Sequence, residues 1–409
     1  MSYKVGSFFF SVSKYGIIRI GDEDVKGNLG KLNYGLLILM VLYSAFGLLM
    51  IFSASSIAAV LRYKVPFNYF FLRQLLWTVI GVAIGIFVLK VPTKKYHILS
   101  TIAIYGIIIA LAMVYIIGFA AGGALSWIDF GFANFQPMEF AKIILIVYMA
   151  VYYNRLSTKK NITFKNMIYP LFLAGVICVL VAAQPDFGGA FIIFLITVLI
   201  FLSLPIGKKY KKTIFKYGGI AAVFVVFALL LFGKSILHSY QVSRIVNFTN
   251  PCQRYSEDTG YQVCNGYIAI KNGGLTGVGL GNSSQKYLYL PEAHTDFIFP
   301  IICEELGLII GILVVIGYFI MLYIILNVAK ETSNLRDSIL AYGIFAYLTA
   351  HILVNILGVL GLIPLTGVPL PFLSYGGSYN ICVIVSFFIV ERINIENKNN
   401  KSLKKIENM

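Results

Sequence analysis

The sequence predicts an all-α polytopic membrane protein, and three observations carry that prediction. Hydrophobic residues make up 59% of the 409 residues and charged residues only 12%, whereas a soluble domain carries about 25% charged residues. Apolar runs of about 20 residues recur along the chain, and each could cross the hydrocarbon core of a bilayer. Basic residues gather in alternate connecting segments, which is typical of cytoplasmic loops.

Ten transmembrane spans can be drawn on the apolar runs. We expect them at Tyr34–Ser53, Phe71–Leu89, His97–Gly118, Gln136–Tyr153, Met167–Ala183, Phe187–Leu204, Phe215–Gly233, Phe297–Val328, Ile339–Leu360 and Tyr375–Ile393. The fourth and fifth spans are short, and the eighth is long enough to tilt or to protrude.

The basic residues predict that both termini lie in the cytoplasm. The segments assigned to the cytoplasm hold Lys90, Lys94, Lys95, Arg155, Lys159, Lys160, Lys165, Lys208, Lys209, Lys211, Lys212, Lys216, Lys330, Arg336 and the basic residues from Arg392 to Lys405. The opposite loops carry few, among them Arg62 and Lys64. We therefore expect a cytoplasmic N-terminal tail over 1–33, a transmembrane domain over 34–393 and a basic cytoplasmic tail over 394–409.

The net charge of +16 would suggest a nucleic-acid partner in a soluble protein. Here the cytoplasmic loops account for it. The chain has no zinc-finger or RNA-binding signature, so we expect no nucleic-acid binding.

The loop 234–296 is predicted to be large and extracellular, and a loop of this length indicates a functional or partly structured segment. Apolar residues at helical spacing over Tyr261–Ile270 favour a short helix lying in the membrane interface. Cys252 and Cys264 share this loop. Outside the cell they could form a disulfide, and free thiols are an equal alternative.

Asp296 is the strongest candidate for a catalytic residue. It lies in the stretch Leu290–Phe299, LPEAHTDFIF, where the long polar loop turns into an apolar helix, and Glu292 and His294 are close in sequence. An acid at a membrane surface is costly and usually has a function. The structural alternative is a helix cap, with Thr295 or Asp296 at the N-cap position.

A second motif reads WIDFG from Trp127, followed by QPMEFAK from Gln136. Pro137 suits a helix start, and Glu139 and Lys142 are three residues apart and so share a helix face. Two interpretations stay open with equal weight. The residues form a local ion pair, or Lys142 faces a cavity and holds an anionic ligand.

Two further motifs occur at helix starts. Asp186 in QPDFGG is favoured as a helix cap, with a substrate contact as the alternative. The Pro364–Ser378 segment has three prolines and then Ser374 and Gly376. It reads as a re-entrant turn or as a helix start that receives phosphate.

Three further polar residues within predicted spans are candidates for a role. Arg73 either snorkels to the interface or pairs with a pyrophosphate. His351 and Asn355 are one turn apart and are expected to bridge neighbouring helices.

The four motifs on one chain resemble the SEDS family of FtsW, RodA and SpoVE. The resemblance runs from Tyr34 to Ile393. The sequence motifs LGN, QK and PEAH between Leu280 and His294 resemble those of FtsW and SpoVE more closely than those of RodA.

This resemblance implies a peptidoglycan glycosyltransferase of the bacterial cytoplasmic membrane. Members polymerise lipid II at the outer face of that membrane, with a single-span class B penicillin-binding transpeptidase as partner. Roles at the division septum, in elongation or in sporulation, with other proteins of those processes as partners, all remain open. The family's catalytic carboxylate maps onto Asp296, which would act as general base on the acceptor hydroxyl with inversion at the anomeric carbon.

The expected substrate contacts surround that base. They are Arg73, Trp127, Glu139, Lys142, Asp186, Gln285, Lys286, Glu292, His294, Thr295, Ser374 and Gly376. Arg73, Lys142 and Lys286 are the candidate cations for the leaving pyrophosphate. The sequence has no metal-ligand spacing. No cofactor is firmly expected, and a divalent cation, Mg²⁺ or Mn²⁺, at the pyrophosphate is left open.

The chain departs from the family pattern at three positions. Ser126 stands where members carry Arg, Met138 replaces a Ser, and Gly189 replaces a Ser or Thr. A cation expected before the fourth span is therefore missing. Two other functions compete with polymerase: a lipid II flippase, and a non-enzymatic scaffold for the transpeptidase.

Overall fold

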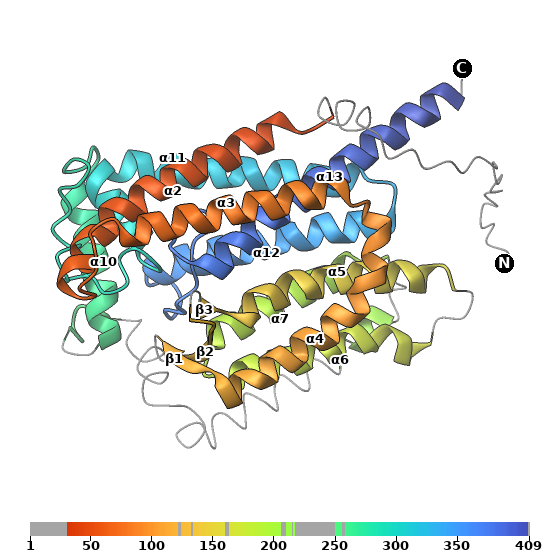
Figure 1. Cartoon of the computed structure of the whole chain (residues 1–409), viewed down its shortest axis with the longest axis horizontal. Coiled ribbons are helices and arrows are strands. Elements are labelled where there is room, and N and C mark those ends of the chain that lie inside the picture. The colour runs from red at the N-terminus through yellow and green to blue at the C-terminus, as the bar shows by residue number, and fades with distance from the viewer. Residues whose placement is uncertain are drawn as a thin grey trace.

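The computed structural model describes residues 31–121, 124–131, 134–159, 163–205, 210–214, 216, 250–255 and 258–407. In this part of the chain, long helices run roughly side by side along the long axis of the molecule (Figure 1). The predicted span Phe215–Gly233 and residues 234–249 of the long loop lie outside the described residues, apart from Lys216. The number of spans therefore stays a prediction.

The long described helices correspond to the other nine predicted spans. They are α2 (Tyr34–Leu61), α3 (Tyr69–Lys90), α4 (Tyr96–Ile117), α5 (Pro137–Ser157), α6 (Phe164–Ala183), α7 (Phe187–Ser203), α11 (Ile298–Glu331), α12 (Leu335–Val359) and α13 (Gly377–Glu407). Among the described helices, seven are long and apolar enough to cross a membrane. The predicted class, an all-α polytopic membrane protein, is confirmed.

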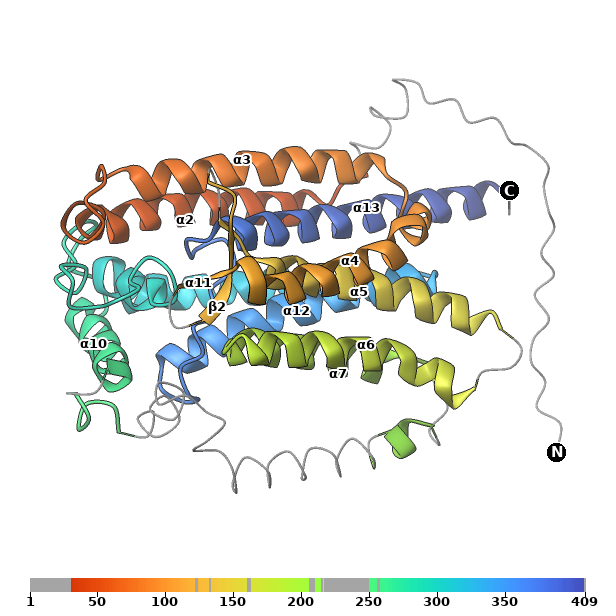
Figure 2. The ribbon, with the colours of Figure 1, turned by 60° about the horizontal axis from the view of Figure 1, so that its bottom comes forward.

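The helices form three layers, which Figure 2 shows from the side. Helices α2, α3 and α13 lie on one side, with α3 packed along α13. Helices α6 and α7 lie on the opposite side, and α5, α11 and α12 occupy the middle. Outward-facing side chains are apolar, as on α4, where Ile102 is 70% and Ile116 83% exposed. Lipid can solvate such faces, because apolar side chains have no polar groups that need hydrogen-bond partners.

Helix α11 is interrupted at Gly307, whose φ of 86° and ψ of 165° are not helical. The chain segment Gly274–Gly279 fills the break. Its carbonyls at Gly274 and Leu275 accept from the N–H groups of Leu308 and Ile309 at 2.9 and 3.3 Å. Buried backbone groups need such partners. The long eighth span is thus two helices joined by a polar contact with the loop before it.

A small antiparallel sheet between α4 and α5 was not predicted. It consists of β1 (Phe119–Ala121), β2 (Ala124–Asp129) and β3 (Asn134–Phe135), in that spatial order. The N–H of Leu125 donates to the carbonyl of Gln184 at 3.2 Å, which ties the sheet to the loop between α6 and α7.

The two ends of the bundle differ in chemistry. We call one the basic end. It holds a network of Thr93, Arg336, Asp337, Arg392 and Glu396. Within the predicted basic tail 394–409, the chain continues α13 as helix to Glu407. There Asn394 donates to the carbonyl of Lys31 at 2.9 Å, so both ends of the described chain meet at the basic end.

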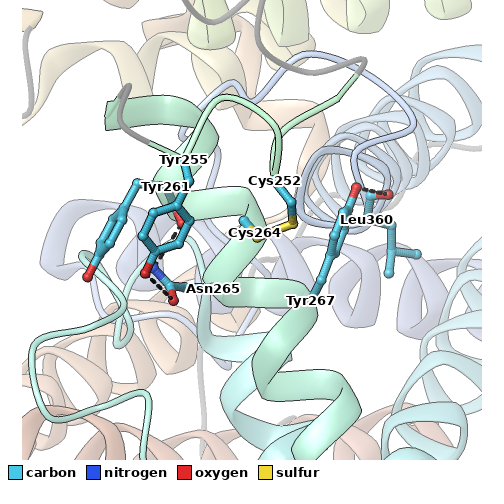
Figure 3. The surroundings of a disulfide bond; sticks show 7 residues. All are labelled: Cys252, Tyr255, Tyr261, Cys264, Asn265, Tyr267 and Leu360. Atoms are coloured by element: carbon cyan, nitrogen blue, oxygen red, sulfur yellow. Dashed lines mark hydrogen bonds between the residues drawn. A yellow bond between two sulfur atoms is a disulfide. The ribbon is translucent and has the colours of Figure 1, made fainter.

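We call the opposite end the loop end, because it carries helix α10 (Asp258–Gly273). This helix confirms the helical prediction over Tyr261–Ile270, and it packs on α11. Cys252 and Cys264 form a disulfide that joins the preceding segment to α10 (Figure 3). On the same helix the hydroxyl of Tyr267 donates to the carbonyl of Leu360 at 3.1 Å.

Candidate active site

Asp296 lies at the loop end, immediately before α11. That helix begins at Ile298, and its N-cap residue is Phe297, without a side-chain cap. The expectation that Thr295 or Asp296 is the N-cap is therefore wrong, because the turn from Glu292 to Phe297 continues past both residues. The N–H groups of Thr295 and Phe297 both donate to the carbonyl of Glu292 at 3.2 Å.

Three neighbours fix the backbone of the Asp296 loop. Asn355 on α12 donates to the carbonyl of Asp296 at 2.8 Å. Ser374 donates its hydroxyl to the carbonyl of Thr295 at 2.6 Å, and the N–H of Tyr375 donates to the carbonyl of His294 at 2.9 Å. Successive carbonyls of this loop are thus held by α12 and by the segment before α13.

His294 anchors the loop through its ring. The imidazole lies 4.6 Å from the ring centroid of Phe70, 5.6 Å from that of Tyr375 and 6.5 Å from that of Tyr63. Burial among these rings lowers the pKa of His294 to about 4, against the attraction of the Glu292 carboxylate. Because burial disfavours the charged form, the imidazole is neutral at neutral pH.

Glu292 and Thr295 are bonded to each other, since the Thr295 hydroxyl donates to the Glu292 carboxylate at 2.9 Å. Arg62, at the end of α2, approaches the same carboxylate at 3.9 Å. Glu292 has a left-handed backbone with φ of 56°, which is uncommon for a residue with a side chain.

Lys286 is buried and paired, so its charge is largely offset. Its ammonium lies 3.1 Å from the Glu305 carboxylate and 3.3 Å from the Ser53 hydroxyl. Ser53 itself donates to Glu305 at 2.7 Å. Glu305 is fully buried, and a buried carboxylate of this kind needs a cation and hydrogen bonds.

Gln285 is held through its backbone by the neighbouring carboxylate. Glu304 accepts from the N–H groups of Ser284 and Gln285 at 3.2 and 3.3 Å, and from the Ser284 hydroxyl at 2.9 Å. It also accepts from the hydroxyl of Ser283. The first helical segment of α11 therefore positions the loop that carries Gln285 and Lys286.

Glu139 and Lys142 form the predicted local ion pair, with Lys142 Nζ 2.8 Å from Glu139 Oε1. The ammonium also lies 3.1 Å from Nε2 of His351, and all three residues are buried. The other imidazole nitrogen of His351 lies 3.2 Å from the carbonyl of Pro369. His351 and Asn355 thus bridge neighbouring segments, as predicted. Whether Lys142 also contacts a ligand stays a prediction.

Arg73 lies on α3, half-buried, with its guanidinium 4.9 Å from the ring centroid of Tyr69. It also interacts with Tyr375, whose N–H holds the Asp296 loop. Among the residues that the structure describes, Arg73 makes no ion pair with a carboxylate. It is therefore the candidate cation with the most freedom to meet an anion.

Ser374 and Gly376 use their polar groups within the protein. The Ser374 hydroxyl accepts from the N–H of Leu370 at 2.8 Å, and the N–H of Gly376 donates to Gln74 at 3.1 Å. They hold the segment that in turn holds Asp296. A substrate contact of either residue stays a prediction.

Asp186 and Trp127 lie on other elements, Asp186 at the start of α7 and Trp127 in β2. Asp186 caps α7 by accepting from the N–H of Gly189 at 2.8 Å, which confirms the capping prediction. Trp127 is half-buried in β2 opposite Phe119. Ser126, which stands where the family pattern has an Arg, is buried.

His294, Thr295 and Glu292 share the loop of Asp296, Ser374 holds that loop, and Arg73 contacts Tyr375, which also holds it. Glu139 and Lys142 form a separate cluster that reaches α12 through His351. No group of three or more His, Cys, Asp or Glu side chains is placed to hold a metal ion within the described ranges. A divalent cation at the pyrophosphate therefore stays an untested expectation.

Sequence reasoning assigned no role in the site to four residues that shape it: Arg62, Phe70, Glu304 and Glu305. Arg62 had one signal, because it is a basic residue in a loop where the charge pattern disfavours one. Glu304 and Glu305 are acids inside an apolar span, which is by itself a functional signal. Phe70 had none.

The described residues define a polytopic helical membrane protein, in which the loop that carries Asp296 is held at the end opposite the basic end. The chain belongs to the FtsW/RodA/SpoVE family, described as "Cell cycle protein", whose model matches residues 34–399.

Named relatives agree with this membership. A probable peptidoglycan glycosyltransferase FtsW of Bacillus subtilis is 37% identical over 388 residues, which cover 94% of this chain and 95% of the relative. One of Coxiella burnetii is 35% identical over 87% of this chain and 94% of the relative.

Two solved structures share the fold. A chain from a peptidoglycan synthase complex superposes with a TM-score of 0.70 at 20% identity, covering 90% of this chain and 98% of that one. The rod shape determining protein RodA of Thermus thermophilus gives 0.62 at 22% identity, covering 89% and 96%.

Proposed function

We propose that this protein is a peptidoglycan glycosyltransferase that joins lipid II disaccharide units into glycan strands at the outer face of the bacterial cytoplasmic membrane. The observation that carries the proposal is the fixed position of the Asp296 loop at the loop end, opposite the basic end. Basic residues favour the cytoplasmic side, so the loop end faces outward. Relatives more than 30% identical bear the name of this activity.

Asp296 acts as the general base in this proposal. Its carboxylate accepts the proton of the acceptor sugar hydroxyl as that oxygen attacks the anomeric carbon of the donor. The bond from that carbon to the pyrophosphate oxygen breaks on the opposite face, so the configuration inverts. The three anchors hold the backbone that carries this carboxyl group, and orientation contributes strongly to rate.

The leaving pyrophosphate needs positive charge. Arg73 is the best candidate, because Lys142 and Lys286 are each paired with a buried carboxylate. Arg73 would then supply the positive charge that an Arg carries in other family members at the position of Ser126. If Mg²⁺ or Mn²⁺ participates, it supplies the same stabilisation to the pyrophosphate.

We further propose a class B penicillin-binding transpeptidase as partner, together with other proteins of division or elongation. The similar fold of a chain from a peptidoglycan synthase complex supports an assembly of this kind. The FtsW names of the relatives favour division at the septum over elongation or sporulation.

The flippase alternative requires a polar path through the middle of the bundle. Glu139, Lys142 and His351 are the polar groups that suggested it, and they are buried and bonded to one another. The scaffold alternative requires that no chemistry depends on Asp296.

One reconstitution separates the three functions. The purified full-length protein with its partner, transpeptidase inactivated, receives labelled lipid II in vesicles. Polymer that appears with the parent and not with Asp296→Asn from the same preparation supports the polymerase. Movement of lipid II between leaflets without polymer supports the flippase. If neither the parent nor Asp296→Asn makes polymer or moves lipid II, the result supports the scaffold.

A further inference from the structure

A cavity of about 300 Å³ lies beside the Asp296 loop, at the loop end. Its wall includes Arg62, Tyr63, Lys286, Leu288, Glu292 and His294. Asp296 is not on this wall, but His294 is only two residues before it. The cavity is therefore a separate space that adjoins the proposed general base and shares its loop.

The backbone of the cavity wall is strained. Leu288 and Glu292 have φ values of 69° and 56°, in the left-handed region that residues with side chains rarely adopt. Backbone strain of this kind persists where the surrounding structure enforces it, and it clusters at ligand-binding sites. Two strained residues on one wall indicate a cavity whose shape is maintained by its surroundings.

The accessible charges of the cavity are one cation and one anion. The Arg62 guanidinium and the Glu292 carboxylate are 3.9 Å apart, and their side chains are 51% and 37% exposed. The guanidinium also lies 5.5 Å from the ring centroid of Tyr63. Lys286 adds little net charge, because Glu305 neutralises it, and His294 is neutral.

Between these charges the wall is largely apolar, formed by Leu288, Leu290, Pro291 and alanines. A neutral sugar would need several hydrogen-bonding side chains and offers no charge to Arg62 or Glu292. A short peptide with a carboxylate, an ammonium and small apolar side chains matches all three features, because guanidinium and carboxylate groups bind ions of opposite charge. The chemistry of the wall thus favours a zwitterionic peptide.

We propose that this cavity binds the short peptide carried by the lipid-linked precursor. Its carboxylate pairs with Arg62, its ammonium pairs with Glu292, and its alanine methyl groups contact Leu288 and Leu290. The inference rests on the proposed function and names the part of the substrate that this wall recognises. Binding of the peptide here would orient the sugar next to the Asp296 loop.

The test compares two substrates on the full-length protein with its partner. One is lipid II with its complete peptide, and the other is lipid II trimmed to the first alanine, with the carboxyl group of that alanine capped as an amide so that neither the carboxylate nor the ammonium remains. With Arg62→Gln or Glu292→Gln, we expect kcat/KM on the complete substrate to fall about tenfold, as for loss of one charged hydrogen bond. On the trimmed substrate each variant stays within about twofold of the parent, since the coupled group is already absent.

Lys271→Ala is the matched control, because Lys271 is an exposed cation on α10 that is not on the cavity wall. This variant should leave kcat/KM unchanged on both substrates. An equal loss on both substrates with Arg62→Gln would show that Arg62 only supports the loop, and no loss on either would show that it binds nothing. Each result overturns the inference.

A second measurement does not depend on turnover. Asp296→Asn protein is mixed with lipid II that carries a photoreactive group on its peptide, and the crosslinked residues are mapped by mass spectrometry. Crosslinks at Tyr63 or Leu288 support the inference, and crosslinks confined to other segments overturn it. If the parent protein makes no polymer, the proposed function fails on that result, and the crosslink still decides the peptide site.

Discussion

The side-chain amide of Asn355 donates a 2.8 Å hydrogen bond to the backbone carbonyl of Asp296. A second bond from the same nitrogen reaches the carbonyl of Val368, also at 2.8 Å. One buried amide on α12 therefore joins the proposed general base to the proline-rich segment. Asn355 is a positioning residue, which acts on the reaction only through Asp296.

Replacing Asn355 by Leu should leave two carbonyls without a partner. Each buried unsatisfied group costs about 1–3 kcal/mol, so the loop should relax. We expect kcat for polymerisation to fall about tenfold or more while KM changes less, because orientation is lost rather than binding. Leu353→Ala, at a 45% exposed position on the same helix, is the control. Unchanged kcat in Asn355→Leu would refute the positioning role.

The break in α11 predicts a large effect of a small side chain. A Cβ atom at Gly307 would lie 2.3 Å from the carbonyl oxygen of Leu275, and the φ of 86° disfavours any L side chain. Gly307→Ala should therefore lower the thermal unfolding midpoint of the detergent-solubilised protein, by several degrees or more. Gly175→Ala on α6, where nothing lies within 4 Å, should leave the midpoint equal or higher. Equal midpoints for the two variants would contradict this account of the break.

His294 should make the loop end sensitive to acid. Its pKa is about 4 in the folded protein, against about 6.5 in an unfolded chain. Between these values the unfolded state binds a proton that the folded state does not, so stability rises with pH. The stability is complete above about pH 6.5 and is lost as the pH falls towards 4.

The comparison for His294 is the unfolding midpoint of the parent and of His294→Phe between pH 8 and pH 4.5. Phenylalanine retains the ring contacts and removes the titration. The parent should lose more stability than the variant across this range. Parallel curves would show that His294 does not bind the proton in question.

The disulfide gives a covalent prediction. Peptide mapping without reduction should recover a linked pair containing Cys252 and Cys264, and alkylation should label neither residue. Cys252→Ser should lower the unfolding midpoint, because closing a loop of about this size stabilises by about 3 kcal/mol. Cys264→Ser should match it, and Cys178→Ala should leave the linked peptide in place. Alkylation of both cysteines in the untreated protein would rule the pairing out.

The helical bundle was predictable, because the length and hydrophobicity of a membrane span are visible in the sequence itself. The starts of α5 and α7 also followed from local rules, since Pro137 and Asp186 stand where a helix start favours them. Charge spacing also raised the Glu139–Lys142 ion pair as one of two open interpretations, and the structure contains that pair. These features depend on residues that are close in sequence.

The details of the site were not predictable in the same way. The break at Gly307 depends on a loop segment about 30 residues earlier, and nothing local distinguishes this glycine from others in the span. The left-handed backbone of Leu288 runs against residue preference. The bond from Asn355 to Asp296 joins residues 59 positions apart. Such contacts arise from tertiary packing, and one sequence carries no signal for them.

The central claim is that Asp296 is the general base, and the rate of glycan polymerisation by Asp296→Asn tests it most directly. The variant keeps the size of the side chain and the backbone bond from Asn355, and removes the proton acceptor. Glu331→Gln, an exposed carboxylate at the basic end, is the matched control. We expect Asp296→Asn to lose at least 100-fold in rate with an unchanged unfolding midpoint, while the control keeps the parental rate. Polymerisation by Asp296→Asn at the parental rate would contradict the account.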